Sequence, residues 1–365
     1  MATDRKFKVG ILGATGMVGQ RFAGLLGSHP WFDVVCVAAS ARSAGKPYRE
    51  AVAGRWTPSA EIPSSVAGLT VLEVEKDMDA IAGQVDIVCS ALSMDKARIR
   101  EIEAQYAKRD VAVVSNNSAH RWTDDVPMIM PEINPHHIGL IDVQRKNRGW
   151  KHGLIVVKPN CSIQSYVPVI DALKAFHPRK AVVTMFQAIS GAGKTFESWP
   201  EMKDNVIPFI NGEEKKSEEE PLKIWGKIQK GTIEMASEPV ITATCVRVPV
   251  TDGHMAVVNL SLGKDADVRT LSDAIRNYGN PLSELNLPSS PNPMLTYFEE
   301  EDRPQTLLDR DLKNGMGISV GRLQKESILG YRFVALSHNT LRGAAGGAVL
   351  TAELLAAKGY IANRI

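Results

Sequence analysis

Cys161, the single cysteine in the segment VVKPNCSIQS, is the residue most clearly suited to chemical catalysis. An apolar run and a proline precede it and an amphipathic run follows, so Asn160 is expected at a helix N-cap and Cys161 in the first helical turn. Pro168 predicts a kink or a restart of that helix. Amide dipoles at a helix N-terminus favour the thiolate, which is the nucleophilic form of cysteine. By its spacing alone, however, a lone cysteine is more often structural than catalytic.

A glycine-rich segment, GILGATGMVG, is the second chemical signal. It follows an apolar run and opens a helical pattern, and its spaced glycines let the backbone approach a pyrophosphate at a helix N-terminus. We therefore predict a dinucleotide site, with contacts from Gly13, Thr15, Gly16, Met17 and Val18. A thiolate beside a nicotinamide is the equipment for oxidising an aldehyde, or for reducing an acyl group through a thioester.

The residues after the second predicted strand favour NADP over NAD. An NAD site places a carboxylate there to bind the ribose 2′-hydroxyl, whereas a 2′-phosphate needs arginine and hydroxyl donors. This chain has Ser40, Arg42 and Ser43, and it has no carboxylate between Asp33 and Glu50. The alternative, that these are only solvated loop residues, stays open.

A second glycine-rich segment, QAISGAGKTF at residues 187–196, ends like a phosphate-binding P-loop. The P-loop pattern GxxxxGK[ST] requires a glycine at position 188, which is Ala188. No Walker-type acidic strand follows downstream. Hydrolysis of a nucleoside triphosphate is therefore not expected.

Composition limits the remaining classes of function. The 43 basic and 41 acidic residues are nearly balanced, so the positive electrostatic field that attracts nucleic acid is not expected. No apolar run reaches the length of about 20 residues that spans a bilayer, and the first ten residues lack the apolar core of a signal peptide, which predicts a cytoplasmic protein without a membrane partner. The four cysteines are scattered, without a CxxC pair, so neither disulfides nor a metal site is expected.

The elements expected to position these residues alternate between strands and helices. A length of 365 residues predicts two lobes. In the N-terminal third, short apolar runs alternate with helical patterns, which predicts a Rossmann-type doubly wound parallel sheet. The apolar runs are FKVGIL, FDVVCVAAS, GLTVLEV, VDIVCSAL and VAVVSNN.

Six motifs together resemble aspartate-semialdehyde dehydrogenase, particularly its archaeal and fungal branch. In chain order they are GILGATGMVGQRF, SNNSAHR, PNCSIQS, QAISGAG, RVPVTDGH and HNTLRGAAGGAVL. The resemblance implies an NADP-binding Rossmann domain over residues 1–158 and 343–365, and a mixed α/β catalytic and dimerisation domain over residues 159–342. It also implies a homodimer or homotetramer that reduces aspartyl 4-phosphate to aspartate 4-semialdehyde, with release of phosphate.

The resemblance assigns roles to single residues. Cys161 would be the nucleophile, Gln187 would orient the acyl group, and His254, titrating near neutrality, would be the acid and base. Arg247 stands in a strand-like segment, an odd place for a guanidinium unless it faces an anion, and would bind the substrate α-carboxylate as a fork. Read without the resemblance, a histidine in a polar turn is usually a surface residue.

The remaining assignments concern the phosphate, the amino group and the cofactor. Arg121 and Lys223 would bind phosphate, Glu220 the substrate amino group, and Asn160 would also contact the substrate. The run NGEEKKSEEE is by itself a solvated helix face, so Glu220 and Lys223 rest mainly on the resemblance. Further contacts to the cofactor are expected from Ser90, Ser190, Gly191 and Asn339.

Two alternatives remain. A malonyl-CoA reductase of the same fold would share the cysteine, glutamine, arginine and histidine, and the predicted phosphate and amino-group residues argue against it only weakly. A non-catalytic NADP-binding protein would keep the glycine loop and would tolerate the loss of Cys161 or His254. Both residues are present in this chain.

Overall fold

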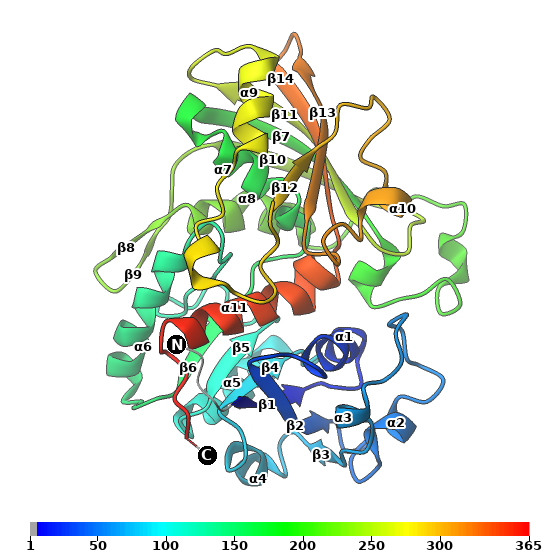
Figure 1. Cartoon of the computed structure of the whole chain (residues 1–365), viewed down its shortest axis with the longest axis vertical. Helices are drawn as coiled ribbons and strands as arrows, with labels where there is room; N and C mark the ends of the chain where they lie inside the picture. Colours follow the sequence, from blue (N-terminus) through cyan, green and yellow to red (C-terminus); the bar gives the residue numbers. More distant parts are fainter. Residues whose placement is uncertain (1–5, 365) are drawn as a thin grey trace.

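Six parallel strands form the first sheet of the computed structural model, which describes residues 6–364 (Figure 1). They are β1 (Phe7–Leu12), β2 (Phe32–Ala39), β3 (Val71–Glu73), β4 (Ile87–Ser90), β5 (Ala112–Ser115) and β6 (Leu154–Val157). Their order is β3-β2-β1-β4-β5-β6, so the winding reverses between β1 and β4. Ligands of open α/β sheets bind at the carboxyl ends of the strands beside such a reversal. The predicted Rossmann-type sheet is confirmed.

Helices cover both faces of this sheet. They are α1 (Met17–Leu26), α2 (Tyr48–Ala51), α3 (Ser64–Ala67), α4 (Met78–Ala82), α5 (Lys96–Lys108) and α6 (Leu140–Arg148). The last helix, α11 (Gly346–Ala357), returns to this lobe and packs against α1 and β5. Figure 1 shows α11, in red, running between the two lobes. Its first ten residues are all buried, because all but Thr351 and Glu353 are apolar or small, and the carboxylate of Glu353 is bonded to His29.

The second sheet is mixed and lies in the other lobe. Its strands are β7 (Pro178–Gln187), β10 (Val240–Arg247), β11 (His254–Leu262), β12 (Leu295–Tyr297), β13 (Ile318–Lys325) and β14 (Tyr331–Ser337). Their order is β10-β7-β11-β14-β13-β12, in which β10 and β7 are parallel and β11 is antiparallel to β7. The predicted mixed α/β fold of this lobe is therefore confirmed.

Helices and a hairpin complete the second lobe. α9 (Val268–Arg276) packs against β12, β13 and α7 (Val167–Ala172), and α8 (Glu213–Ile224) packs against the edge strand β10. The hairpin β8 (Lys227–Gln229) and β9 (Thr232–Glu234) and the single turn α10 (Thr306–Asp309) lie in the connections. Alternate side chains along the edge strand β10 and its neighbour β7 stay exposed, among them Val182, Val240, Thr242 and Thr244. One face of this sheet is therefore incompletely covered.

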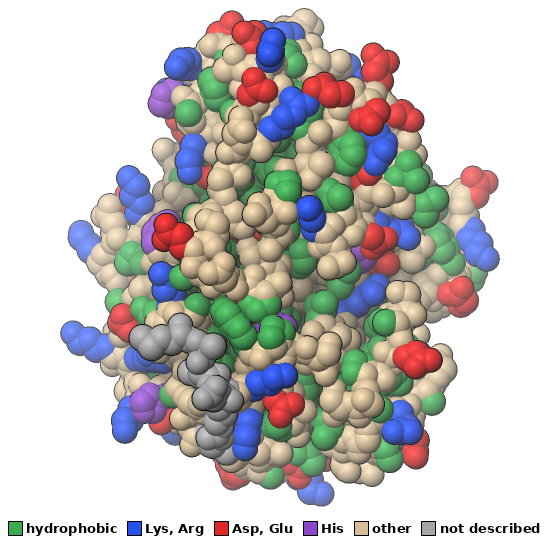
Figure 2. Space-filling view, viewed as in Figure 1, with side chains coloured by type: hydrophobic (Ala, Val, Ile, Leu, Met, Phe, Trp, Pro, Cys, Tyr) green, Lys and Arg blue, Asp and Glu red, His purple; other side chains and the backbone are tan. Residues whose placement is uncertain are grey.

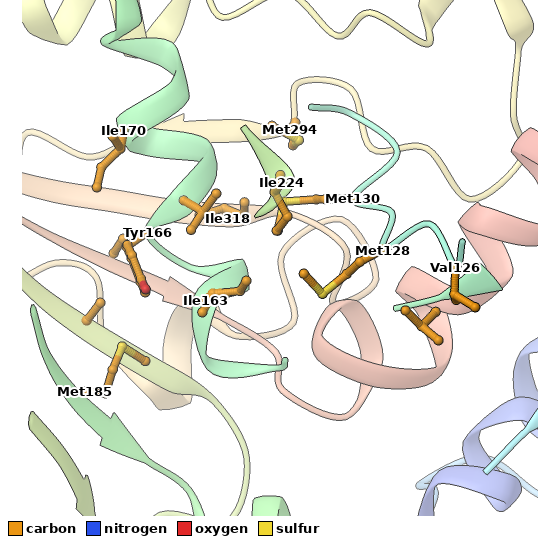
Figure 3. Packing of buried hydrophobic residues seen from close by; sticks show 14 of the residues in the cluster. Val126, Met128, Met130, Ile163, Tyr166, Ile170, Met185, Ile224, Met294 and Ile318 are labelled. Carbon is orange, nitrogen blue, oxygen red and sulfur yellow. The ribbon is translucent and has the colours of Figure 1, made fainter. Parts of the chain in front are cut away.

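The larger apolar core continues from the first sheet into the second lobe. Figure 3 shows that the segment after Cys161 contributes Ile163, Tyr166 and Ile170 to it, near Met185 of β7, Ile224 of α8 and Ile318 of β13. A dense interior resists displacement of any one member, so this packing fixes the segment that carries the cysteine.

The surface carries charges of both signs. Figure 2 shows basic and acidic side chains interspersed on the face in view. Among residues 6–364, no helix combines the length and apolar character needed to cross a membrane. The cytoplasmic location stays a prediction.

Candidate active site

Cys161 follows the carboxyl end of β6, where the first sheet passes into the second lobe. It caps a single 3₁₀ turn, Ser162–Gln164, and α7 begins only at Val167, with Pro168 in its first turn. The predicted restart at the proline is confirmed, but the predicted helix beginning at Cys161 is wrong. The Oδ1 atom of Asn160 accepts a hydrogen bond of 2.8 Å from the N–H of Ser162, so the predicted capping contact is present on a shorter element.

The thiol is not held as a thiolate by a helix dipole. One 3₁₀ turn supplies little dipole, and burial raises the pKa of Cys161, with a further increase from Glu213. Three cations, Lys158, Arg121 and Lys216, act in the opposite direction and lower it. Activation of the sulfur therefore depends on neighbouring charges.

His254 begins β11 and faces Cys161. Its Nε2 atom lies 3.5 Å from Sγ of Cys161, and its Nδ1 atom accepts a hydrogen bond of 3.1 Å from the N–H of Ala188. Burial, and then the charge of Arg247, lower the pKa of His254 to about 3, so the expectation of a group titrating near neutrality is wrong. Because a backbone N–H can only donate, the proton of the neutral ring lies on Nε2, toward the sulfur.

Arg247 and Gln187 end two neighbouring parallel strands, β10 and β7, in direct register. Nη1 of Arg247 donates a hydrogen bond of 2.6 Å to the carbonyl of Ala188. A side chain at Gly191 would place its Cβ 2.9 Å from this Nη1 and 3.0 Å from Cε1 of His254, so only glycine fits over the pair. Nε2 of Gln187 donates to Oε2 of Glu213 at 3.2 Å.

A cavity of about 250 Å³ opens onto Cys161. Among the predicted site residues it is lined by Val18, Arg121, Asn160, Cys161, Ser190, Gly191 and Asn339. Residues that were not predicted also line it: Asn116, Asn117, Ser118, Glu213, Lys216, Thr340, Gly343 and Ala344. Asn339 donates to Oγ of Ser190 at 2.8 Å and accepts at 2.8 Å from the N–H of Gly253, beside His254. It therefore ties the loop at Ser190 to the turn before the histidine.

Glu220 and Lys223 do not line this cavity, which corrects their predicted contacts with substrate. The carboxylate of Glu220 is fully buried and accepts from Nη1 of Arg121 at 2.8 Å and from the N–H of Asn160 at 2.6 Å. Nζ of Lys223 donates to the carbonyl of Arg121 at 2.5 Å, and burial lowers its pKa to about 8. The charged groups of both side chains are hydrogen-bonded to protein groups beneath the cavity.

The residues that do line the cavity from α8 are Glu213 and Lys216. They have the same Glu-x-x-Lys spacing and lie seven residues earlier, with Nζ of Lys216 at 2.6 Å from Oε1 of Glu213. Burial raises the pKa of Glu213, but the charge and hydrogen bond of Lys216 and the hydrogen bond of Gln187 leave it below its ordinary value. The repeated spacing was a signal that the sequence contained and that our assignment did not use.

A second cavity, of about 330 Å³, lies over the carboxyl ends of β1, β2 and β4. The predicted cofactor residues Gly13, Thr15, Gly16, Ser40 and Arg42 line it, together with two residues that were not predicted, Glu73 and Glu75. Gly13 has φ of +78°, and a Cβ there would lie 2.4 Å from the carbonyl oxygen of Ala91. A backbone cradle with no room for side chains and an arginine at its rim fit a phosphorylated dinucleotide.

Three predicted cofactor residues lie outside the lining of both cavities. Met17 begins α1, and Ser43 is buried, with its N–H bonded to the carbonyl of Ser40. Ser90 is fully buried at the end of β4, where its Oγ accepts from Nδ2 of Asn117 at 3.1 Å. These residues shape the loops around the cavities, and direct contacts from them with a cofactor stay predictions.

Comparison with known proteins gives the family. Two family models match, the semialdehyde dehydrogenase NAD binding domain over residues 8–141 and the semialdehyde dehydrogenase dimerisation domain over residues 168–342. An aspartate-semialdehyde dehydrogenase of Archaeoglobus fulgidus is 45% identical over 96% of this chain and 98% of its own. A crystal structure of aspartate semialdehyde dehydrogenase with NADP from Candida albicans has a TM-score of 0.87 and 36% identity, covering 98% of this chain and 100% of its own. A malonyl CoA reductase (NADP) of Metallosphaera sedula is 37% identical over 99% of each chain. The chain belongs to the aspartate-semialdehyde dehydrogenase family.

Proposed function

We propose that this chain catalyses the NADPH-dependent reduction of L-aspartyl 4-phosphate to L-aspartate 4-semialdehyde and phosphate, in the biosynthesis of lysine, threonine, methionine and isoleucine. The observation that carries the proposal is the 3.5 Å approach of Cys161 to His254 at a cavity lined by Arg121, Glu213 and Lys216. A nucleophile, a proton donor, two cations and a carboxylate match an amino acid that carries an acyl phosphate. The full-length likeness to aspartate-semialdehyde dehydrogenases supports this substrate.

Charged groups around the cavity orient the substrate in this proposal. Arg121 and Lys216 bind the phosphate, and the carboxylate of Glu213 binds the α-ammonium group. Arg247 binds the α-carboxylate; it does not itself line the cavity but lies directly behind Gly191, which does. Its Nη1 is held by Ala188, while its Nε and Nη2 donate to no residue among 6–364, so they are available to a ligand.

Cys161 then attacks the acyl carbon. The bond between that carbon and the phosphate oxygen breaks, phosphate leaves, and a thioester joins the acyl group to Sγ, which splits one hard step into two. The cations near Cys161 favour the thiolate that this step requires. Gln187, held by Glu213, is placed to orient the acyl group.

The reduction uses both cavities, because the dinucleotide loop lines the second cavity and Cys161 lines the first. NADPH, when bound, supplies the hydride for the thioester carbon. Gly13, Thr15 and Gly16 would hold its pyrophosphate and Arg42 its 2′-phosphate. His254, neutral and protonated on Nε2, hydrogen-bonds the oxygen that gains charge. When that oxygen re-forms the carbonyl, the carbon–sulfur bond breaks, the semialdehyde is released and Sγ of Cys161 leaves as the thiolate.

We also propose that two copies associate through the second sheet, within a catalytic and dimerisation domain of residues 159–342. The exposed apolar side chains Val182 and Val240 on its uncovered face support this, as does the match to a dimerisation domain. Residues 1–158 and 343–365 form the NADP-binding domain in this proposal. Val240→Asp should shift the protein toward monomers in sedimentation velocity, whereas an unchanged oligomer would exclude this face; wild-type mass separates a homodimer from a homotetramer.

The function is tested by nicotinamide absorbance with aspartate semialdehyde, inorganic phosphate and either NADP or NAD. The expected result is formation of NADPH that requires both the semialdehyde and phosphate. A parallel assay offers malonyl-CoA with NADPH. Oxidation of NADPH by malonyl-CoA, with no activity toward the semialdehyde, would overturn the substrate and keep only the cysteine chemistry.

A further inference from the structure

Glu220 contacts two segments of the active site at once, although it lies beneath the cavity. One carboxylate oxygen accepts from Nη1 of Arg121 at 2.8 Å, and the other accepts from the backbone N–H of Asn160 at 2.6 Å. Arg121 comes from the loop after β5, whereas Asn160 directly precedes the nucleophile Cys161. A fully buried carboxylate with both oxygens engaged is rigidly held, because breaking either bond leaves an uncompensated charge.

The bond to Glu220 fixes the direction of the Arg121 guanidinium. Nε of Arg121 donates to the carbonyl of Lys158 at 3.0 Å, so a second nitrogen of the guanidinium is also held. A guanidinium is planar, so two fixed nitrogens determine where the third points. Nη2 of Arg121 donates to no residue in the described part of the chain, and Arg121 lines the cavity, so Nη2 is the donor left for an anion.

The second oxygen of Glu220 fixes the backbone at the nucleophile. The side chain of Asn160 is already engaged, with Oδ1 on the N–H of Ser162 and Nδ2 at 3.2 Å from Glu213. On the other side, Gly343 packs so closely that a Cβ there would lie 2.9 Å from Cβ of Cys161. The cysteine is therefore held between the Glu220 contact and the π-helical turn at Leu341–Ala345.

We propose that Glu220 is a positioning residue that sets the separation of the phosphate-binding arginine and the nucleophilic sulfur. This inference rests on the proposed function and adds a residue to it. In an acyl phosphate the phosphorus and the attacked carbon share one bridging oxygen, so arginine and thiol must be spaced to match a rigid group. A displacement of about 1 Å in such an arrangement costs on the order of 100-fold in rate. One carboxylate bonded to both segments enforces that spacing.

The two α8 lysines nearest to Glu220 in the sequence, Lys223 and Lys216, each bond to a group other than its carboxylate. Lys223, one turn along α8, donates to the carbonyl of Arg121, so it supports the same arginine from the backbone side. Lys216 is bonded to Glu213 instead and stays in the cavity. Glu220 therefore serves protein groups alone and has no free oxygen for the substrate.

The test is kinetic, using Glu220→Gln and phosphate-dependent oxidation of aspartate semialdehyde. The amide keeps one acceptor but presents N–H groups to the other partner, so one of the two contacts is lost. We expect kcat to fall about tenfold or more and KM for phosphate to rise several-fold. The matched control is Glu353→Gln, another fully buried carboxylate, bonded to His29 at 2.9 Å and to the N–H of Ser289.

A double-mutant cycle distinguishes positioning from general destabilisation. If Glu220 acts on phosphate through Arg121, Glu220→Gln should raise KM for phosphate by less than about twofold in an Arg121→Ala background. Independent, multiplying effects on KM would overturn the proposal, as would kinetics equal to those of Glu353→Gln. If Glu220→Gln does not fold, Glu220→Asp keeps the charge but is too short to reach both partners, and the same outcomes apply. A wild-type enzyme without phosphate-dependent activity would instead refute the proposed function.

Discussion

Two Glu-x-x-Lys pairs on the same helix differ in what surrounds them. Glu213 and Lys216 lie in the first turn of α8 and line the cavity, whereas Glu220 and Lys223 lie two turns later and are buried below it. Seven residues advance a helix by about 10 Å and return it to nearly the same face. The two pairs therefore have the same sequence pattern but lie at different depths below the cavity. In the proposed function, the pair at the cavity contacts the substrate, and the buried pair holds other active-site residues in place.

The first and largest difference should come from removing the charge of Glu213. Glu213→Gln is expected to lower kcat/KM for the semialdehyde about 100-fold, because a hydrogen bond to a charged group contributes about 1.5–3 kcal/mol. The melting temperature should change by no more than about 3 °C, since Glu213 borders a cavity. Steady-state kinetics and calorimetry check both. A kcat/KM within about threefold of wild type would remove Glu213 from substrate binding.

The second difference is the pH dependence of stability that the buried Lys223 confers. Burial lowers its pKa to about 8, below the unfolded value of about 10.4, so the unfolded chain binds more protons between these values. Stability from this group is therefore lowest below pH 8 and rises as the pH increases through that window. Relative to Lys223→Met, wild type should gain about 2 kcal/mol from pH 7 to pH 10 in urea unfolding.

Lys216→Met is the control for that measurement, because Lys216 lies in the cavity. It removes a lysine of the same helix that is not buried beneath the cavity, so it shows what loss of an α8 lysine does in general. A difference between wild type and Lys223→Met that does not change with pH would mean that Lys223 is not desolvated in the folded protein.

The third difference concerns the phosphate. Lys216→Met should raise KM for phosphate about tenfold, since one cation of the cavity is lost, which corresponds to about 1.4 kcal/mol. Lys223→Met should change that KM less, because its ammonium group is bonded to the carbonyl of Arg121. The reverse order of the two effects would return Lys223 to the phosphate site.

The smallest expected effect is that of Lys158 on the pKa of the Cys161 thiol. Lys158 is buried, which lowers its own pKa to about 7, and its charge, where it is protonated, lowers the pKa of Cys161 against the effect of burial. Lys158→Met should move the pH midpoint of Cys161 alkylation by iodoacetamide upward by less than about one unit, because the lysine loses charge as the pH rises above 7. A midpoint that stays in place would remove Lys158 from the cations that act on the thiol.

The sequence was sufficient for the fold and for residues whose backbone placement follows from their pattern. The glycine loop at Gly13 and Gly16 was predicted, because strand–loop–helix alternation places it at the carboxyl edge of a sheet. Arg247 was expected in a strand, and it ends β10. Cys161 and His254 were expected together from the resemblance, and the structure places them 3.5 Å apart.

The sequence was not sufficient to predict a residue's role where that role depends on how deeply the side chain is buried. Nothing in the Glu-x-x-Lys pattern distinguishes Glu213 from Glu220, since burial depends on the loop carrying Arg121 and on the segment before Cys161. The pKa of His254 was misjudged for the same reason, because desolvation and Arg247 arise only in the folded chain. Ser43 and Ser90 have suitable chemistry but turn into the protein.

The central claim is that Cys161 forms the covalent intermediate. The most direct measurement is turnover of Cys161→Ala in the phosphate-dependent assay, together with its melting temperature and its binding of NADP. We expect loss of turnover by at least about 1,000-fold with folding and NADP binding intact, since the nucleophile is removed and the cofactor cavity is not touched. Turnover near that of wild type would contradict the thioester mechanism.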